Sequence, residues 1–191
     1  NSTEDIDHIQ ATASKAALVK SKTDFEGLIV KGVGSDYRWH NLDSYLVEGV
    51  YPNTQDNLNN EILLSQTIAQ RLNVSVGDRV TAYFQNSSST GTPNTRYFKI
   101  VGIYETGFPD FDSAYLFADI RHIQRINKWS SDAIGGLEIF LNESFCEINI
   151  WWNSYIIQNT VNNFLVKYAN SSTKNIIDDD KLLLKSIFNL N

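Results

Sequence analysis

The spacing of apolar residues near the middle of the chain predicts a short helix. Ile68, Ala69 and Leu72 fall on one side of a helix with 3.6 residues per turn. Ser65 stands just before them, and a serine at this place caps the free backbone N–H groups of a helix start. Asn73 follows, and asparagine tolerates the left-handed conformation that ends many helices. We therefore expect a helix between Ser65 and Asn73.

An alternating pattern directly after this helix predicts a β-hairpin. Val80, Ala82 and Phe84 alternate with polar positions, as in a strand with one buried face. Residues 86–95 consist mainly of Asn, Ser, Thr, Gly and Pro, which are typical of a loop at a hairpin tip. The return strand is expected over residues 97–104.

The helical spacing and the strand alternation also predict most of the remaining elements. Residues 27–33, 114–117 and 137–141 each have the composition of a strand. Asp119 is expected to cap a second helix, and residues 145–168 predict a longer amphipathic helix. The apolar side of the second helix comprises Ile120, Ile123, Ile126 and Trp129. Strands that alternate with helices indicate a mixed α/β chain.

Composition narrows the function classes. The 191 residues include 16 Lys+Arg and 22 Asp+Glu, giving a net charge of −6, which argues against nucleic-acid binding. A single cysteine, Cys146, excludes an internal disulfide framework. No run approaches the roughly 18 apolar residues that a membrane span needs. The chain contains no methionine, even at position 1, so we expect it to be a fragment of a larger protein.

Carboxylates and histidines are the candidates for chemistry. Asp110, Asp112 and Glu105 could bind a hard cation through oxygen, but acidic residues in such a segment more often cap turns. The histidines, His8, His40 and His122, are far apart, and none has a second ligand at helical spacing. Neither a phosphate-binding loop nor a G-x-S-x-G motif occurs. The sequence therefore predicts no catalytic residue, no cofactor and no metal.

Aromatic residues are the candidates for partner contacts. Phe108 and Phe111 lie in residues 105–112, which we expect to be irregular and exposed. Trp151 and Trp152 are adjacent, so on a helix they point about 100° apart and one can face a partner. The predicted contact residues are Phe108, Phe111 and Trp151. The surrounding segment, residues 145–157, is unusually aromatic.

The order of several motifs resembles that of a known family. The motifs are NEILLS at 60–65, VGDRV at 76–80, RYFKIVGIYETG at 96–107, FDSAYLF at 111–117 and GLEIFL at 136–141. Together they resemble the periplasmic domains of FtsX-like ABC transporter permeases. The likeness is closest to the lipoprotein-releasing LolC/LolE type and more distant to the MacB-like periplasmic core domain. It covers about residues 25–142.

The resemblance implies an α+β fold in two parts. Both ends of the chain, residues 1–44 and 113–191, would form a porter-like α/β layer. Residues 45–112 would form an inserted, mostly β subdomain with one helix. In the family member that recruits a carrier, the hairpin tip matching residues 86–95 is a long hook. Here this loop is short and lacks the apolar and basic residues that would grip a carrier.

The resemblance also implies a mechanical function without catalysis. Such a domain lies on the periplasmic side of the inner membrane of a Gram-negative bacterium, held there by flanking helices that this chain lacks. It couples ATP-driven transmembrane motion to the release or export of lipoproteins or another substrate. The implied partners are a cytoplasmic ATPase subunit, a second permease copy or paralogue, and a lipoprotein or periplasmic carrier.

Two other hypotheses remain open on the sequence. A secreted binding or adhesion module would use an exposed aromatic patch and would have no membrane segments in its parent gene. A hydrolase or metal enzyme would need a pocket that forms only in the folded chain. Its residues would come from Asp110, Asp112, His122 and Glu138.

Overall fold

In the computed structural model, the described residues are 6–85 and 92–141. The chain divides into two compact units, Ile9–Glu138 and a second made of Asn1–His8 and Ile139–Asn191. In the second unit, the rings of His8 and Phe140 lie 6.0 Å apart. The fold and the sites below belong to the first unit.

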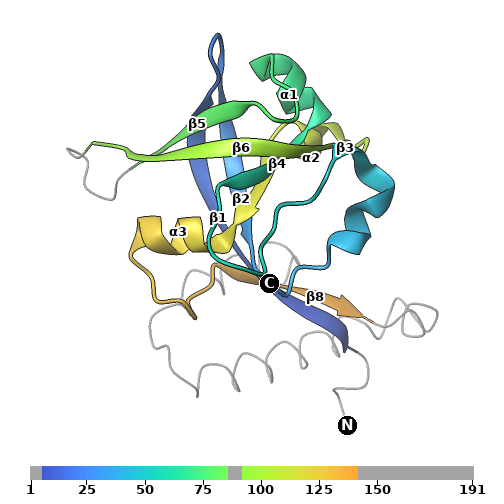
Figure 1. Cartoon of the computed structure of the whole chain (residues 1–191). Helices are drawn as coiled ribbons and strands as arrows, with labels where there is room; N and C mark the ends of the chain where they lie inside the picture. The colour runs from blue at the N-terminus through green and yellow to red at the C-terminus, as the bar shows by residue number, and fades with distance from the viewer. Residues whose placement is uncertain (1–5, 86–91, 142–191) are drawn as a thin grey trace, which may run out of the picture. The chain divides into compact units, whose positions relative to one another are not determined.

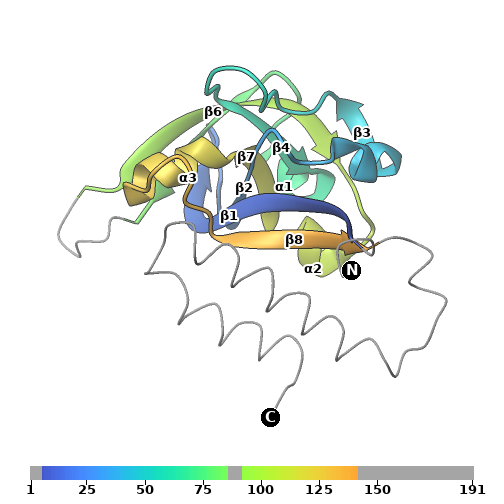
Figure 2. The same cartoon turned by 90° about the horizontal axis from the view of Figure 1, so that it is seen from below.

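Eight strands form one sheet that closes on itself (Figures 1 and 2). The strands are β1 (Ile6–Lys20), β2 (Phe25–Val33), β3 (Leu46–Gly49), β4 (Glu61–Ser65), β5 (Arg79–Phe84), β6 (Asn94–Tyr104), β7 (Tyr115–Asp119) and β8 (Gly136–Leu141). Their order is β2-β7-β4-β6-β5-β1-β8, and β1 also pairs with β2. The pairs β2–β7 and β4–β6 are parallel. Six strands thus form a closed ring, to which β8 adds beside β1 and β3 beside β6.

Closure of the ring depends on β1, for which the sequence analysis predicted no element. Its last four residues pair with β2 on one side and with β5 on the other. The inner face of β1 is lined by small residues, Ala13 and Ala17, with Val19. Alanine favours helices over strands, so this segment lacks the branched residues by which strands are recognised in a sequence.

The inside of the ring is the main core. It is filled from alternate positions of the strands and from two helices, α1 (Gln66–Leu72) and α3 (Ile120–Asn127). Its largest fully buried members include Phe84, Phe98, Ile62, Leu64, Ile68, Leu72, Ile100, Leu116 and Ile123. The helices contribute the faces that the periodicity predicted. Trp129 is an exception, because it follows α3 and is 39% exposed.

Helix α1 begins and ends as predicted, and α3 begins as predicted. The Ser65 hydroxyl accepts a hydrogen bond from the Ile68 N–H at 3.1 Å, and Asn73 has the left-handed conformation with φ 51°. The Asp119 carboxylate likewise accepts from the Arg121 N–H at 2.9 Å. Lys128 ends α3 with φ 57°. The predicted hairpin is present as β5 and β6, which pair in antiparallel register.

A second, smaller cluster lies on the outer face of the ring. Val33, Leu63, Tyr104 and Phe117 form its buried part. The 3₁₀ helix η1 (Trp39–Tyr45) and its flanks cover them with Tyr37, Trp39, Leu42, Leu46 and Tyr51. The Trp39 ring stacks on Tyr51 at 5.0 Å and meets Phe117 edge-on at 5.9 Å.

The predicted mixed α/β class is confirmed. The predicted division into residues 1–44 with 113–191 and residues 45–112 stays a prediction, because residues 142–191 lie outside the described part. The ring itself takes strands from both of these segments.

Candidate partner interface

Phe108 is a strongly exposed aromatic residue on a tightly held turn. Its side chain is 67% exposed. The turn follows β6 and leads into a short helix, α2 (Pro109–Asp112), where the sequence had predicted irregular structure. Gly107 permits the turn because its φ is +78°, a conformation that residues with a Cβ rarely adopt.

The buried carboxylate of Asp112 fixes this turn. It is 3% exposed and accepts hydrogen bonds from the Thr106 N–H at 3.1 Å, the Thr106 hydroxyl at 2.7 Å and the Gly107 N–H at 3.0 Å. The Thr106 hydroxyl oxygen accepts in turn from the Phe108 N–H at 3.2 Å. Asp112 therefore caps a turn, as expected for an acidic residue here, and holds Phe108 in an ordered position. Ordered, exposed aromatic side chains are typical anchors of protein interfaces.

The other two predicted contact residues are Phe111 and Trp151. Phe111 is half-buried and packs on the outer cluster, stacked on the Tyr115 ring at 4.9 Å and 6.0 Å from the Tyr104 ring. The expectation that it would be exposed is wrong, because α2 turns its side chain toward the sheet. Trp151, with the aromatic segment 145–157, lies outside the described residues.

Two phenols of the outer cluster are structural groups. The Tyr104 hydroxyl donates to the Tyr115 carbonyl at 2.9 Å, and burial raises the pKa of Tyr104 well above its usual value. Tyr51 donates to Asp43 at 2.9 Å, and burial together with this hydrogen bond raises the pKa of Tyr51 to about 12. Both phenols therefore stay neutral donors at physiological pH.

The four residues of the hydrolase hypothesis do not share a pocket. Asp112 caps its own turn, and His122 on α3 bonds to the Asn59 carbonyl. Glu138 pairs with Lys31 and accepts from the Gln10 amide at 2.7 Å. Two hollows lined by described residues, one beside Leu18 and one beside Val47, contain none of the four.

No metal centre forms among the described residues. Within residues 6–85 and 92–141, no group of three or more His, Cys, Asp or Glu side chains is placed to hold an ion. Cys146 lies outside this part of the chain.

His122 is buried more deeply than the sequence indicated. It is 1% exposed, and its Nε2 lies 2.7 Å from the Asn59 carbonyl oxygen, which can only accept, so Nε2 carries the proton. Its Nδ1 is buried without a hydrogen-bond partner. The ring packs edge-on against Phe98 at 4.9 Å. Burial lowers the pKa of His122, so this histidine is a neutral core residue.

Comparisons with known proteins identify the fold. No protein-family model matches the sequence, and no curated protein is similar to it in sequence. Among solved structures, the chain is similar to the periplasmic region of MacB from Actinobacillus actinomycetemcomitans. That match has a TM-score of 0.56 and 13% identity, and it covers 90% of this chain and 79% of that chain.

A second solved structure is the extracellular domain of the noncanonic ABC-type transporter YknZ from Gram-positive bacteria. Its TM-score is 0.52 at 12% identity, and the match covers 74% of this chain and 68% of that chain. The chain thus has the fold seen in extracytoplasmic domains of ABC-type transporters. Among the described residues, no helix is long and apolar enough to cross a membrane.

Proposed function

We propose that this chain is the non-catalytic extracytoplasmic domain of an ABC transporter permease. The observation that carries the proposal is the likeness to the periplasmic region of MacB over 90% of this chain. The motif order, which resembles FtsX-like permeases, supports it independently. The interior of the ring, packed with apolar side chains, suits a rigid body that transmits motion.

The partners and substrate follow as finer parts of this proposal. A cytoplasmic ATPase subunit would drive the motion, and a second permease copy or paralogue would complete the transporter. The substrate would be a lipoprotein, as in the LolC/LolE type that the motifs resemble, at the inner membrane of a Gram-negative bacterium. Phe108 and Trp151 would contact a partner, and Phe111 would support Phe108 from the outer cluster.

The complete parental reading frame tests the proposal most directly. We expect a span of about 20 apolar residues just before Asn1 and another just after Asn191. We also expect the full-length protein to copurify with an ATP-hydrolysing subunit. A cleavable signal before the segment with no apolar span after it would contradict the proposal.

Phe108 provides a test of the contact surface. In the full-length complex, Phe108→Ser is expected to weaken association with the second permease copy or carrier by at least about tenfold, as for an aromatic anchor. The matched control is Trp129→Ser, which removes an exposed aromatic side chain at the end of α3. An equal loss of affinity in both variants would show that Phe108 is not part of the interface.

A secreted binding module is the second candidate, favoured by the same exposed Phe108. It would need neither membrane spans nor an ATPase, so the reading frame distinguishes the two functions.

A further inference from the structure

A patch of apolar side chains lies on the outer face of the ring, away from η1. Leu18 is the cross-strand partner of Tyr83, and Phe25 pairs with Lys20 at the start of β2. Their sequence neighbours Ala17 and Phe84 point into the main core, so by strand alternation these side chains point outward. Leu18 is 45% exposed and Phe25 69% exposed.

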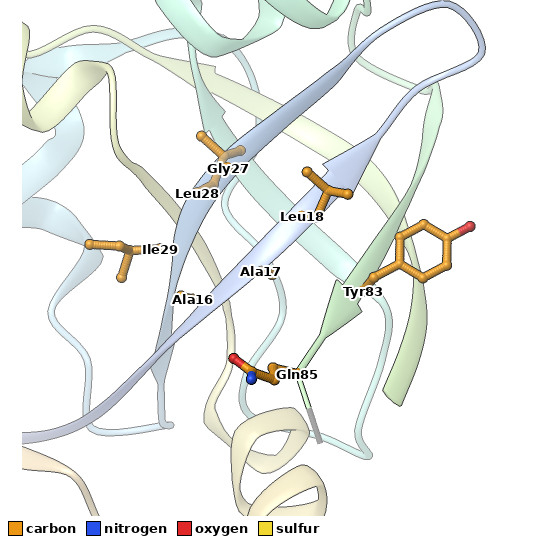
Figure 3. A pocket seen from close by; sticks show the side chains of 8 residues that line it. All are labelled: Ala16, Ala17, Leu18, Gly27, Leu28, Ile29, Tyr83 and Gln85. Carbon is orange, nitrogen blue, oxygen red and sulfur yellow. The ribbon is translucent and has the colours of Figure 1, made fainter. Parts of the chain in front are cut away.

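The patch contains a hollow of a size that accepts a side chain. Figure 3 shows Leu18 on β1 between Gly27 on β2 and Tyr83 on β5. The hollow has a volume of about 400 Å³. The space beside Gly27 is open, because a Cβ at this position would meet no atom within 4 Å.

Three cations lie on the same face. The register places Lys20 on β1 opposite Thr81 on β5, and Arg79 on β5 opposite Lys99 on β6. Arg79 is two residues from Thr81, so the side chains of both point to the same side of the sheet. Lys20, Arg79 and Lys99 are exposed, and none of them is ion-paired to another described residue.

A carboxylate with a local hydrogen-bond partner also lies on this face. Glu61 is the cross-strand partner of Lys99, but its carboxylate accepts from the Asn53 N–H at 2.9 Å. Three exposed cations thus lie beside the exposed apolar residues of a chain whose net charge is −6. This local charge is complementary to an acidic partner.

We propose that this outer-face patch binds an acidic protein segment, which inserts an apolar side chain beside Gly27 and places its carboxylates against Lys20, Arg79 and Lys99. The hollow favours a protein segment over an anionic membrane, because a single side chain can enter a surface hollow beside Leu18 and a bilayer surface cannot. The patch goes beyond the proposed transport function and does not rest on it.

Peptide binding to the 191-residue chain tests this inference. The probe is a fluorescein-labelled peptide of alternating Glu and Leu, with a Lys–Leu peptide of equal length as the charge control. We expect the Glu–Leu peptide to bind, and R79Q/K99Q and L18S/Y83S each to weaken it by roughly tenfold in fluorescence anisotropy.

Matched variants on other surfaces provide the controls. R71Q/R125Q removes two exposed cations from α1 and α3, and V47S/V50S removes two exposed apolar side chains on and directly after β3. Both should change the affinity by less than about twofold, because they lie outside the patch. Thermal unfolding by circular dichroism verifies that each variant is folded.

Three results would overturn the proposal. The first is equal weakening by the control variants, and the second is binding of the Lys–Leu peptide as tight as that of the Glu–Leu peptide. The third is a chain that does not bind the Glu–Leu peptide but sediments with phosphatidylcholine vesicles containing phosphatidylglycerol, with the patch variants reducing this sedimentation. That result would assign the patch to a membrane surface.

Discussion

At the scale of single residues, two buried polar groups have opposite roles. The carboxylate of Asp112 organises an exposed turn through several hydrogen bonds, whereas His122 fills space in the core with one ring nitrogen unpaired. Asp112 therefore stabilises the turn at residues 106–108, and His122 makes the stability of the chain depend on pH.

Replacing Asp112 by alanine should destabilise the chain by about 2–3 kcal/mol, because it removes the buried carboxylate that accepts from the Thr106 hydroxyl and from the N–H groups of Thr106 and Gly107. Urea unfolding followed by tryptophan fluorescence measures this. Asp110→Ala removes an exposed carboxylate two residues away and should change stability by less than about 0.5 kcal/mol. Similar losses in the two variants would show that Asp112 does not hold the turn.

The chain should become less stable as the pH falls below the ordinary histidine pKa of 6.5. Burial lowers the pKa of His122 in the folded state, so the unfolded chain binds the extra proton first. The neutral ring's contribution is fully present above pH 6.5 and decreases as the pH falls from there toward the folded-state pKa. The maximum slope for one proton is about 1.4 kcal/mol per pH unit.

The charged and polar groups around His122 also act on its pKa in the folded state. Asp119 stabilises the protonated ring, whereas Arg96 and Arg125 oppose it, and the Asn59 carbonyl occupies Nε2. Urea unfolding of wild type and His122→Gln between pH 7.5 and pH 5 isolates the effect, since only wild type carries this proton. Parallel stability profiles for the two proteins would contradict the prediction.

At the scale of elements, α3 packs closely on β2 because residue 32 is glycine. A Cβ at Gly32 would lie 2.8 Å from the Ile120 Cα and 2.9 Å from the Ile123 Cδ1. Gly32→Ala should therefore cost about 1–3 kcal/mol by displacing the helix. Gly27→Ala on the same strand faces open space and should have little effect. Chemical unfolding of both variants tests this, and equal stabilities would show that α3 adjusts without cost.

Elements whose local signals agree with their tertiary environment could be predicted. α1 has a capping serine, three apolar residues on one face and an asparagine at its end, and all of them act as the pattern indicated. β1 could not be predicted, because its inner face uses alanine and its pairing with β5 joins residues about 60 positions apart. No local period encodes such a pairing.

Of the two candidate sites, the sequence could point to Phe108 but not to the outer-face patch. Phe108 could be singled out as an aromatic residue in a loop, but its order depends on Asp112, whose burial no sequence period reveals. The outer-face patch could not be found in this way, because it combines four strands whose register the sequence leaves open. A signal existed in the outward positions of β5, exposed Arg79 and half-buried Tyr83, which alternate with the buried ones.

At the scale of the whole molecule, ring closure makes stability uneven. β4 lies between β6 and β7, and its residues Ile62, Leu63 and Leu64 are fully buried. β3 pairs with β6 alone, and Val47 on it is 54% exposed. Hydrogen exchange in native conditions should therefore protect β4 amides by the full free energy of unfolding. Amides of β3 should exchange through local opening, and equal protection of the two strands would contradict this.

The position of β8 beside β1 has a mechanical consequence. The Gly135 N–H bonds to the Thr12 carbonyl at 2.8 Å, and Gln10 bonds to Glu138, so the two strands run in opposite directions. A tension that separates residue 10 from residue 138 loads these hydrogen bonds one after another, and each contributes only about 0.5–1.5 kcal/mol. The strands would peel apart at low force. The ring would keep its shape, because β1 is paired with a strand on both sides there. The ring would therefore behave as a stiff body, and the β1–β8 pairing would be the part that yields under force.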